Sequence, residues 1–96
     1  MEATTTADVD EFFNLQGDWY VRTIDPLATN FFESLLPFLK LESATSVIEV
    51  GCGQGNGIPL LLEKIPEDCP VWAGDLNEKM LGYARKRGFP EKVSIC

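Results

Sequence analysis

The sequence predicts an α/β fold, a doubly wound sheet of three parallel strands flanked by helices, and three observations lead to it. Short β-branched runs occupy residues 47–50, 71–73 and 93–96. Apolar residues at helical spacing fill the two stretches between these runs, and a glycine-rich turn follows the first run. Strands that alternate with helices imply parallel crossover connections, which is the layout of this fold class.

The length and charge of the chain limit its size and its partners. Its 96 residues allow one small domain, and a formal net charge of -7 disfavours nucleic-acid phosphate as a partner of this segment. Three widely spaced cysteines without any histidine indicate neither a disulfide framework nor a zinc site, which favours a cytoplasmic or nuclear protein. The sequence contains no apolar run of membrane-spanning length, so we expect no membrane partner.

The N-terminal part is expected to be a disordered lead over residues 1–8 and a helical segment over residues 9–45. Aromatic residues between positions 9 and 20 follow no clean period, which predicts a short helix followed by a loop. Trp19 and Tyr20 in this stretch either pack against the sheet or close over a bound ligand.

A second helix is expected from Asp25, which is typical of an N-cap residue before a proline. Its apolar residues form a broad stripe suited to packing on a sheet, and Pro37 is expected to distort or end the helix. The stripe consists of Leu27, Phe31, Leu35 and Leu39, with Phe32, Leu36 and Phe38 beside it.

Residues 46–96 contain the predicted strands and the two helices between them. The first helix begins near Ile58 and ends before Pro66. The second is capped by Asn77, runs over residues 78–87 and stops at Gly88. Its inward-facing residues are expected to be Met80, Leu81 and Ala84.

The glycine-rich turn, residues 49–57, stands between a predicted strand and a predicted helix. Gly51 and Gly53 let the backbone turn tightly and approach a ligand without a Cβ in the way, and the helix N-terminus offers unpaired N–H donors. Asp75 ends the second strand, where a carboxylate can accept hydrogen bonds from both hydroxyls of a ribose.

Other interpretations of these residues stay open from the sequence. A turn that binds nothing can contain the same glycines, and Asp75 by itself could be a turn residue or a helix cap. A nicotinamide-dinucleotide site needs a glycine three places after the second one, and those places hold Asn56 and Ile58. Cys52 has no neighbour that would activate a thiol, which indicates a small residue in the turn.

Residues 47–57 resemble motif I of class I S-adenosylmethionine-dependent methyltransferases, in which an acidic residue stands two places before a Gly-x-Gly-x-Gly run. The resemblance extends over residues 47–96 and implies the N-terminal half of that family's Rossmann-like sheet, with S-adenosylmethionine as cofactor and S-adenosylhomocysteine as its product. It implies that the acidic residue holds the cofactor amine, the turn lies against the methionine part, and residues 75 and 76 contact the ribose and the adenine. The implied cofactor-binding residues are Glu49, Gly51, Cys52, Gly53, Asn56, Asp75 and Leu76.

Within that family, residues 51–61 resemble the methyltransferase-like enzymes that form 3-methylcytidine in transfer RNA, with Asn56 as the suggestive residue. The chain departs from that group at Val9, where a tryptophan is expected, and in its acidic charge. Small-molecule methyltransferases, ubiquinone-type ones included, share the same motifs, so the acceptor is either a small molecule or a tRNA cytidine. No catalytic residue is assigned, because the chain has no histidine and Glu49 and Asp75 are already assigned to the cofactor.

The resemblance covers about half of the family's core, so the strand at residues 47–50 is expected to have an unpaired edge. We expect a truncated chain, a splice product, or a subunit whose missing strands come from a second chain. The alternative function is a non-catalytic interaction module that docks a partner through the open edge of the sheet.

Overall fold

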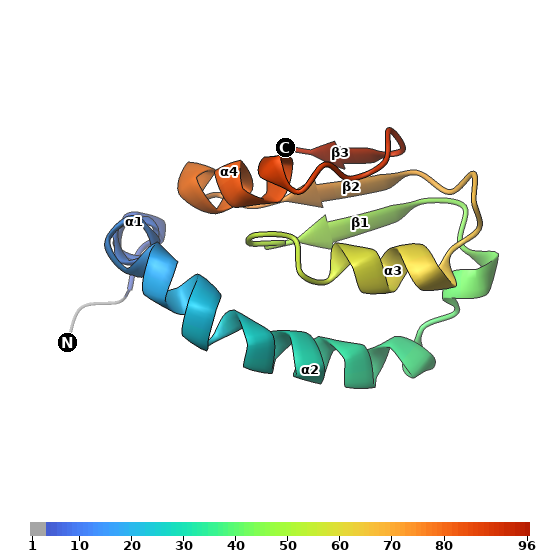
Figure 1. Cartoon of the computed structure of the whole chain (residues 1–96), viewed down its shortest axis with the longest axis horizontal. Coiled ribbons are helices and arrows are strands. Elements are labelled where there is room, and N and C mark those ends of the chain that lie inside the picture. The colour runs from blue at the N-terminus through green and yellow to red at the C-terminus, as the bar shows by residue number, and fades with distance from the viewer. Residues whose placement is uncertain (1–3) are drawn as a thin grey trace.

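The computed structural model describes residues 4–96, and a three-stranded parallel sheet forms its centre. The strands are β1 (Val47–Val50), β2 (Val71–Gly74) and β3 (Val93–Ile95), in the spatial order β1-β2-β3 (Figure 1). Val71 pairs with Val47 on one side and with Val93 on the other. The predicted strands and the predicted fold class are therefore confirmed.

Two helices connect the strands, α3 (Ile58–Lys64) and α4 (Glu78–Lys86). The predicted cap of α4 is confirmed, because the Asn77 side chain accepts a hydrogen bond from the Met80 N–H at 3.0 Å. Gly88 follows α4 with φ at +67°, the left-handed conformation that glycine adopts without strain. None of the helices between residues 4 and 96 is long and apolar enough to cross a bilayer.

The described helices α3 and α4 pack on one face of the sheet. Val71 and Ala73 of β2 are fully buried against apolar side chains that include Leu61 of α3 and Leu81 of α4. The alternate positions of the strands point to the other face, where Ile48 and Val50 of β1 and Trp72 of β2 are exposed. One apolar sheet face and the outer edge of β1 are thus uncovered in the part of the chain that the structure describes.

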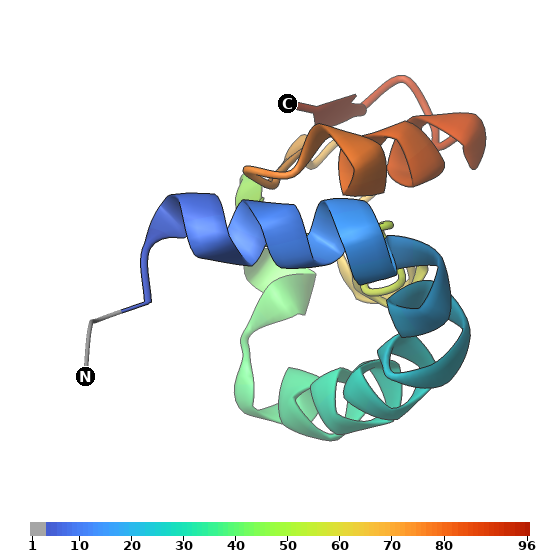
Figure 2. The same cartoon turned by 90° about the vertical axis from the view of Figure 1, so that its left-hand side faces the viewer.

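The first helix, α1 (Thr6–Thr23), is longer than predicted and continuous, so the expected loop after a short helix is wrong. Thr5 and Asp8 explain its start, because each side chain accepts a hydrogen bond from the other residue's backbone N–H, at 3.1 and 2.9 Å. The predicted lead over residues 1–8 is therefore too long, and residues 1–3 lie outside the described residues. In Figure 2, α1 crosses in front of the carboxyl ends of the strands.

The second helix, α2 (Asp25–Leu35), follows α1 with only Ile24 between them and continues into a short 3₁₀ turn, η1 (Leu36–Phe38). A second 3₁₀ turn, η2 (Leu41–Ser43), precedes β1. Pro37 ends the α-helical part as predicted. The predicted N-cap is wrong by one residue: Ile24 holds that position in helical conformation, so Asp25 is already helical and its side chain caps nothing.

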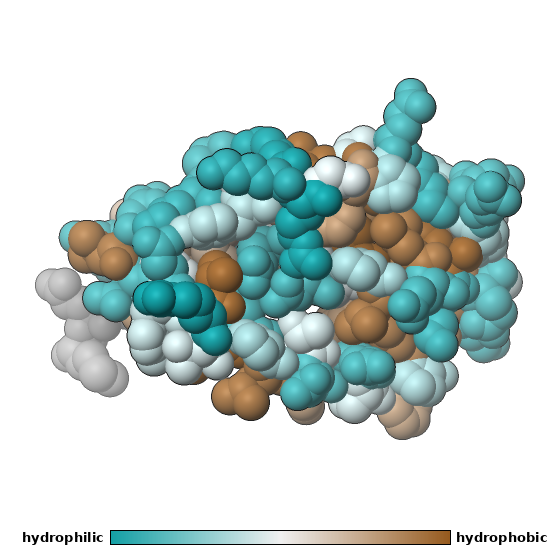
Figure 3. Space-filling view, viewed as in Figure 1, coloured by the Kyte–Doolittle hydropathy of each residue, from teal (hydrophilic) through white to brown (hydrophobic). Residues whose placement is uncertain are grey.

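The apolar stripe of α2 faces solvent instead of the sheet, which corrects a second prediction. Leu27 and Phe31 are 66% and 68% exposed, and Leu35 and Leu39 are exposed as well. The neighbouring face of the helix is the one that packs: Leu36 is buried and Phe32 lies against the same core cluster. Figure 3 shows apolar side chains along the lower edge of the molecule, where Figure 1 places α2.

Two adjacent phenylalanines test which face of α2 is the core face. Phe32→Ala is expected to lower the free energy of unfolding by about 2 kcal/mol, because it removes a ring that packs on the core. Phe31→Ala is the matched control and should stay within about 0.5 kcal/mol of the wild type, because that ring is largely in water. Urea unfolding followed by circular dichroism measures both, and equal losses would contradict the assignment of the faces.

Candidate functional site

The glycine-rich turn is tied to the end of the neighbouring strand. Gly51, Gly53 and Gly55 have φ values of +74°, +57° and +87°, a region that residues with a Cβ rarely adopt. The backbone N–H groups of Gly51 and Cys52 both donate to the Gly74 carbonyl oxygen, at 2.8 Å each. The turn that leaves β1 is therefore bonded directly to the last residue of β2.

Asp75 meets the same turn through its carboxylate. Its Oδ2 accepts a hydrogen bond from the Gly53 N–H at 2.9 Å, and its Oδ1 accepts one from the Asn77 N–H at 2.9 Å. Each carboxylate oxygen has a second lone pair and can accept from a ligand as well. The predicted meeting of the turn and Asp75 is confirmed, and their role in binding stays a prediction.

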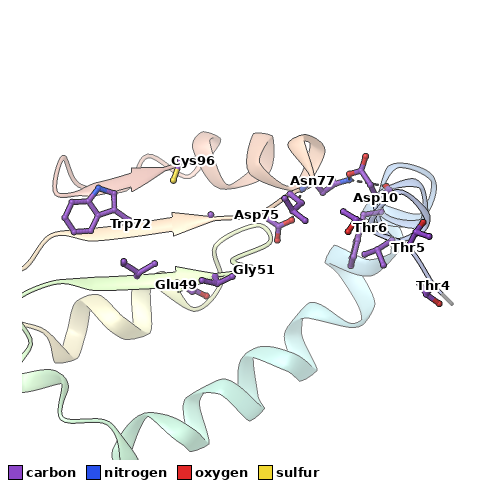
Figure 4. A pocket seen from close by; sticks show the side chains of 16 residues that line it. Thr4, Thr5, Thr6, Asp10, Glu49, Gly51, Trp72, Asp75, Asn77 and Cys96 are labelled. Atoms are coloured by element: carbon purple, nitrogen blue, oxygen red, sulfur yellow. Dashed lines mark hydrogen bonds between the residues drawn. The ribbon is translucent and has the colours of Figure 1, made fainter.

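Two cavities flank this junction. The larger, about 910 Å³, extends from the N-terminal segment past the carboxyl ends of β1 and β2 onto the uncovered sheet face, where Ile48, Val50 and Trp72 line it (Figure 4). Of the predicted site residues, Glu49, Gly51, Asp75 and Leu76 line it. The smaller, about 200 Å³, lies between the turn and the helices α1 and α2, and Glu49, Gly51 and Asp75 line it too. Cys52, Gly53 and Asn56 also line the smaller cavity, so all seven predicted site residues border one cavity or the other.

Glu49 has an unusual environment for a carboxylate. Its Oε2 atom is buried and has no hydrogen-bond partner among the described residues. Burial raises the pKa of Glu49 from 4.5 to about 7, because the charged form loses hydration that no protein donor replaces. A cationic group placed beside Oε2 would supply the missing partner, which makes Glu49 a candidate for holding an ammonium.

Cys52 and Asn56 have less direct relations to the cavities. Burial raises the pKa of the Cys52 thiol to about 11, and the negative charges of Glu49 and Asp75 act in the same direction. The thiol is therefore protonated at neutral pH and is not a nucleophile, in agreement with the sequence interpretation. The Asn56 side-chain oxygen accepts a hydrogen bond from the Arg87 guanidinium, which ties the turn to the end of α4.

Helices α1 and α2 contribute further lining residues. Of Trp19 and Tyr20, which the sequence offered as residues that could close over a ligand, only Tyr20 lines a cavity. Thr5, Asp10 and Phe13 of the N-terminal segment line the larger cavity, and Tyr20 and Asp25 line the smaller one. The Phe13 and Tyr20 rings pack edge to face with centroids 4.9 Å apart. Their separation of seven residues places both on one helix face, a signal that the sequence already contained.

The charges around the site are of one sign. Carboxylates of Asp10, Asp25, Glu49 and Asp75 line the cavities, and no lysine or arginine within residues 4–96 lines either one. The pKa of Asp25 is raised, first by its own burial and also by the charge of Asp75. Such a site favours a ligand with positive charge and disfavours a pyrophosphate.

No protein-family model matches the sequence. The malonyl-[acyl-carrier protein] O-methyltransferase of Priestia megaterium is 29% identical over 86 residues, which is 90% of this chain and 28% of that protein.

Solved structures share the fold. A complex between the Haloferax volcanii Trm112 methyltransferase activator and a methyltransferase matches with a TM-score of 0.74 and 18% identity, over 91% of this chain and 38% of the other. The Synechocystis magnesium protoporphyrin IX methyltransferase with bound S-adenosylmethionine matches with a TM-score of 0.72 and 18% identity, over 100% of this chain and 56% of the other. The chain spans only 28% to 56% of the length of these proteins. It therefore has the fold of S-adenosylmethionine-dependent methyltransferases, over the part of that fold that it spans.

Proposed function

We propose that this chain supplies the cofactor-binding half of an S-adenosylmethionine-dependent methyltransferase. One observation carries the proposal: the glycine-rich turn, Glu49 and Asp75 border the same two cavities, and no basic side chain of the described residues lines them. S-adenosylmethionine combines a ribose with an ammonium and a sulfonium, so it has both the hydroxyls and the positive charge that such a site favours. In this proposal residues 46–96 form the cofactor-binding unit and residues 9–45 a helical segment in front of it.

The roles of the site residues follow from their places in the structure. Asp75 accepts hydrogen bonds from the ribose hydroxyls with the lone pairs that the turn leaves free. Glu49 takes the ammonium, because its Oε2 has no other partner within residues 4–96. Leu76, 80% exposed at the edge of the larger cavity, contacts the adenine, while Gly51, Cys52, Gly53 and Asn56 border the methionine part.

The nicotinamide-dinucleotide interpretation is disfavoured by the same residues. A pyrophosphate between Glu49 and Asp75 would place two negative groups beside two carboxylates in a partly dehydrated site. The turn also lacks the third glycine of the dinucleotide pattern, since Asn56 and Ile58 occupy its possible positions. Both arguments favour S-adenosylmethionine.

In this proposal the residues of the chain contribute little acid–base chemistry to methyl transfer. When bound, S-adenosylmethionine supplies a methyl group on a sulfonium. The residues of the chain bind and orient the molecule and exclude water, which are the main contributions that a displacement of this kind requires. We assign no catalytic residue, and the acceptor stays a small molecule or a tRNA cytidine. The net charge of -7 disfavours an RNA contact on this segment, so a tRNA acceptor would need a basic surface elsewhere.

A second chain that completes the sheet stays part of the proposal. The outer edge of β1 is unpaired, and Val50 on this strand is 90% exposed. Such an edge is compatible with a non-catalytic interaction module as well. The unpaired edge does not favour that module over methyl transfer, because an interaction module would leave the acidic, glycine-lined cavities without a role.

Calorimetry with S-adenosylhomocysteine tests the proposal. Asp75→Ala is expected to weaken binding about 10- to 100-fold, because charged hydrogen bonds to the ribose are lost. Asp68→Ala is the matched control: it removes an exposed carboxylate that lines neither cavity, and it should bind like the wild type. Equal affinity in the Asp75→Ala variant, or no binding by the wild type, would overturn the assignment.

A further inference from the structure

Asn77 joins the first helix to the edge of the candidate site. Its side chain is almost fully buried, with 2% exposed. Its amide Nδ2 donates to three oxygens of α1: the Asp10 carbonyl at 3.2 Å, the Asp10 Oδ1 at 2.7 Å and the Asn14 Oδ1 at 3.0 Å. Figure 4 shows the contact between Asn77 and Asp10 at the rim of the larger cavity.

The remaining polar groups of Asn77 serve the other side of this junction. Its backbone N–H donates to the Asp75 Oδ1, and its side-chain Oδ1 accepts from the Met80 N–H at the start of α4. One buried residue therefore contacts the ribose-binding candidate Asp75, the N-terminus of α4 and two residues of α1. An amide buried in this way is costly to leave without partners, so it holds its neighbours in one arrangement.

Apolar packing attaches α1 to the rest of the fold only weakly. Gly17 is the one residue of α1 that is buried, and Leu15 on this helix is 72% exposed. The further contacts to α4 are polar and more exposed: Lys79 reaches the Asn14 carbonyl oxygen at 3.3 Å and the Asp18 carboxylate at 3.7 Å, and the Tyr83 hydroxyl donates to the Asp18 carboxylate. The partly buried hydrogen bonds of the buried Asn77 side chain are thus the best candidates for fixing the position of α1.

The position of α1 matters for the site because this helix forms one wall of the larger cavity. Thr6, Val9 and Phe13 line that cavity opposite Gly51 and Asp75. If α1 moved away, this side of the cavity would open to water. A ligand held between the sheet and α1 would then lose the contacts and the exclusion of water that the helix provides.

We propose that Asn77, together with Asp10 and Asn14, is a positioning unit that couples the docking of α1 to cofactor binding. The proposal rests on the proposed function for the identity of the ligand. Because coupling is reciprocal, S-adenosylhomocysteine should hold α1 more firmly in place, and loosening α1 should weaken S-adenosylhomocysteine binding by the same factor.

The test removes the amide donors of Asn77 and keeps its cap. In Asn77→Ser the hydroxyl still accepts from the Met80 N–H, while the bonds to α1 are lost. Hydrogen exchange should become about tenfold faster in α1 and stay unchanged in β1 and β2, and S-adenosylhomocysteine should bind about tenfold more weakly. Asn14→Ala loosens the same contact from the α1 side without changing the cavity lining, and a smaller change in both readouts is expected.

The outcomes separate the two proposals. In the wild type, bound S-adenosylhomocysteine should slow exchange in α1, and this protection should be lost in Asn77→Ser. Unchanged exchange in α1 in both variants would overturn the positioning role, and so would a loosened α1 with unchanged affinity. If exchange also rises in the strands of Asn77→Ser, the Asn14→Ala variant decides. Failure of the wild type to bind would overturn the proposed function. Hydrogen exchange in α1 of the two variants would still test whether the positioning unit holds this helix.

Discussion

Replacement of Gly57 by alanine is expected to lower the free energy of unfolding by about 3 kcal/mol. A Cβ at this position would lie 2.9 Å from the Phe32 Cε1 and 3.1 Å from the Glu49 Oε1. The first distance is shorter than carbon atoms tolerate, and the Phe32 ring packs against the core cluster, so overpacking is the cause of the loss. The backbone itself is not strained, because Gly57 has a φ of -76°.

Gly82→Ala is the matched control. Gly82 lies within α4, and nothing stands within 4 Å of the position that its Cβ would take. Alanine there should raise the free energy of unfolding by about 0.5–1 kcal/mol, because a helix interior favours it over glycine. Urea unfolding of both variants measures the difference, which should reach about 4 kcal/mol.

The double variant Gly57→Ala, Phe32→Leu identifies the clash. A leucine leaves room where the phenylalanine ring stands, so the double variant should lose less stability than the two single changes together. Additive losses, or a Gly57→Ala variant as stable as the wild type, would contradict this account of how α2 packs on the turn.

Local chemistry explains which parts of the fold could be predicted from the sequence. Strands β1 and β2 were predictable because short apolar runs with β-branched residues end at glycine, and β3 because such a run follows the turn after α4. Asn77 and Gly88 marked the two ends of α4 because capping depends on the side chain or φ of a single residue. The meeting of the turn with Asp75 was predictable for a related reason: parallel strands bring their carboxyl ends to the same edge.

The helices in front of the sheet depended on packing that the sequence did not specify. Both faces of α2 are apolar, so the spacing of Phe31 and Phe32 could not show which of them faces inward. The observed choice follows from the turn, where Phe32 lies against Gly57. The start of α1 differs in this respect, because the reciprocal Thr5–Asp8 cap that fixes it is a local signal that the sequence already contains.

In the candidate site, too, some features could be predicted from local sequence patterns and others depend on tertiary contacts. Residue types and spacing indicated Glu49 and Asp75, but the walls that α1 and α2 provide depend on contacts such as Asn77 with Asp10, which are 67 residues apart. The missing partner of the Glu49 Oε2 is also a tertiary property. It makes the protonation of this residue the most sensitive test of the site.

The contribution of Glu49 to stability is expected to fall by roughly 2–3 kcal/mol as pH rises from 4.5 through 7, after allowance for partial solvent contact. Burial raises the pKa of Glu49 to about 7, against 4.5 for an ordinary glutamate. Between these values the folded chain holds a proton that the unfolded chain has lost, so stability is fully present below pH 4.5 and is lost as pH rises through 7.

Glu49→Gln isolates this effect, because glutamine has nearly the same shape and does not titrate. The difference in unfolding free energy between the wild type and Glu49→Gln should therefore fall as pH rises. The titration of the other carboxylates is common to both proteins and cancels in this difference. Binding should respond in the opposite sense: an ammonium beside Oε2 favours the ionised carboxylate, so wild-type affinity for S-adenosylhomocysteine should rise from pH 6 to 8. In Glu49→Gln this rise should disappear. Parallel stability curves for the two proteins from pH 5 to 8 would contradict the raised pKa of Glu49. An affinity that rises equally in Glu49→Gln would remove Glu49 as the partner of the amine.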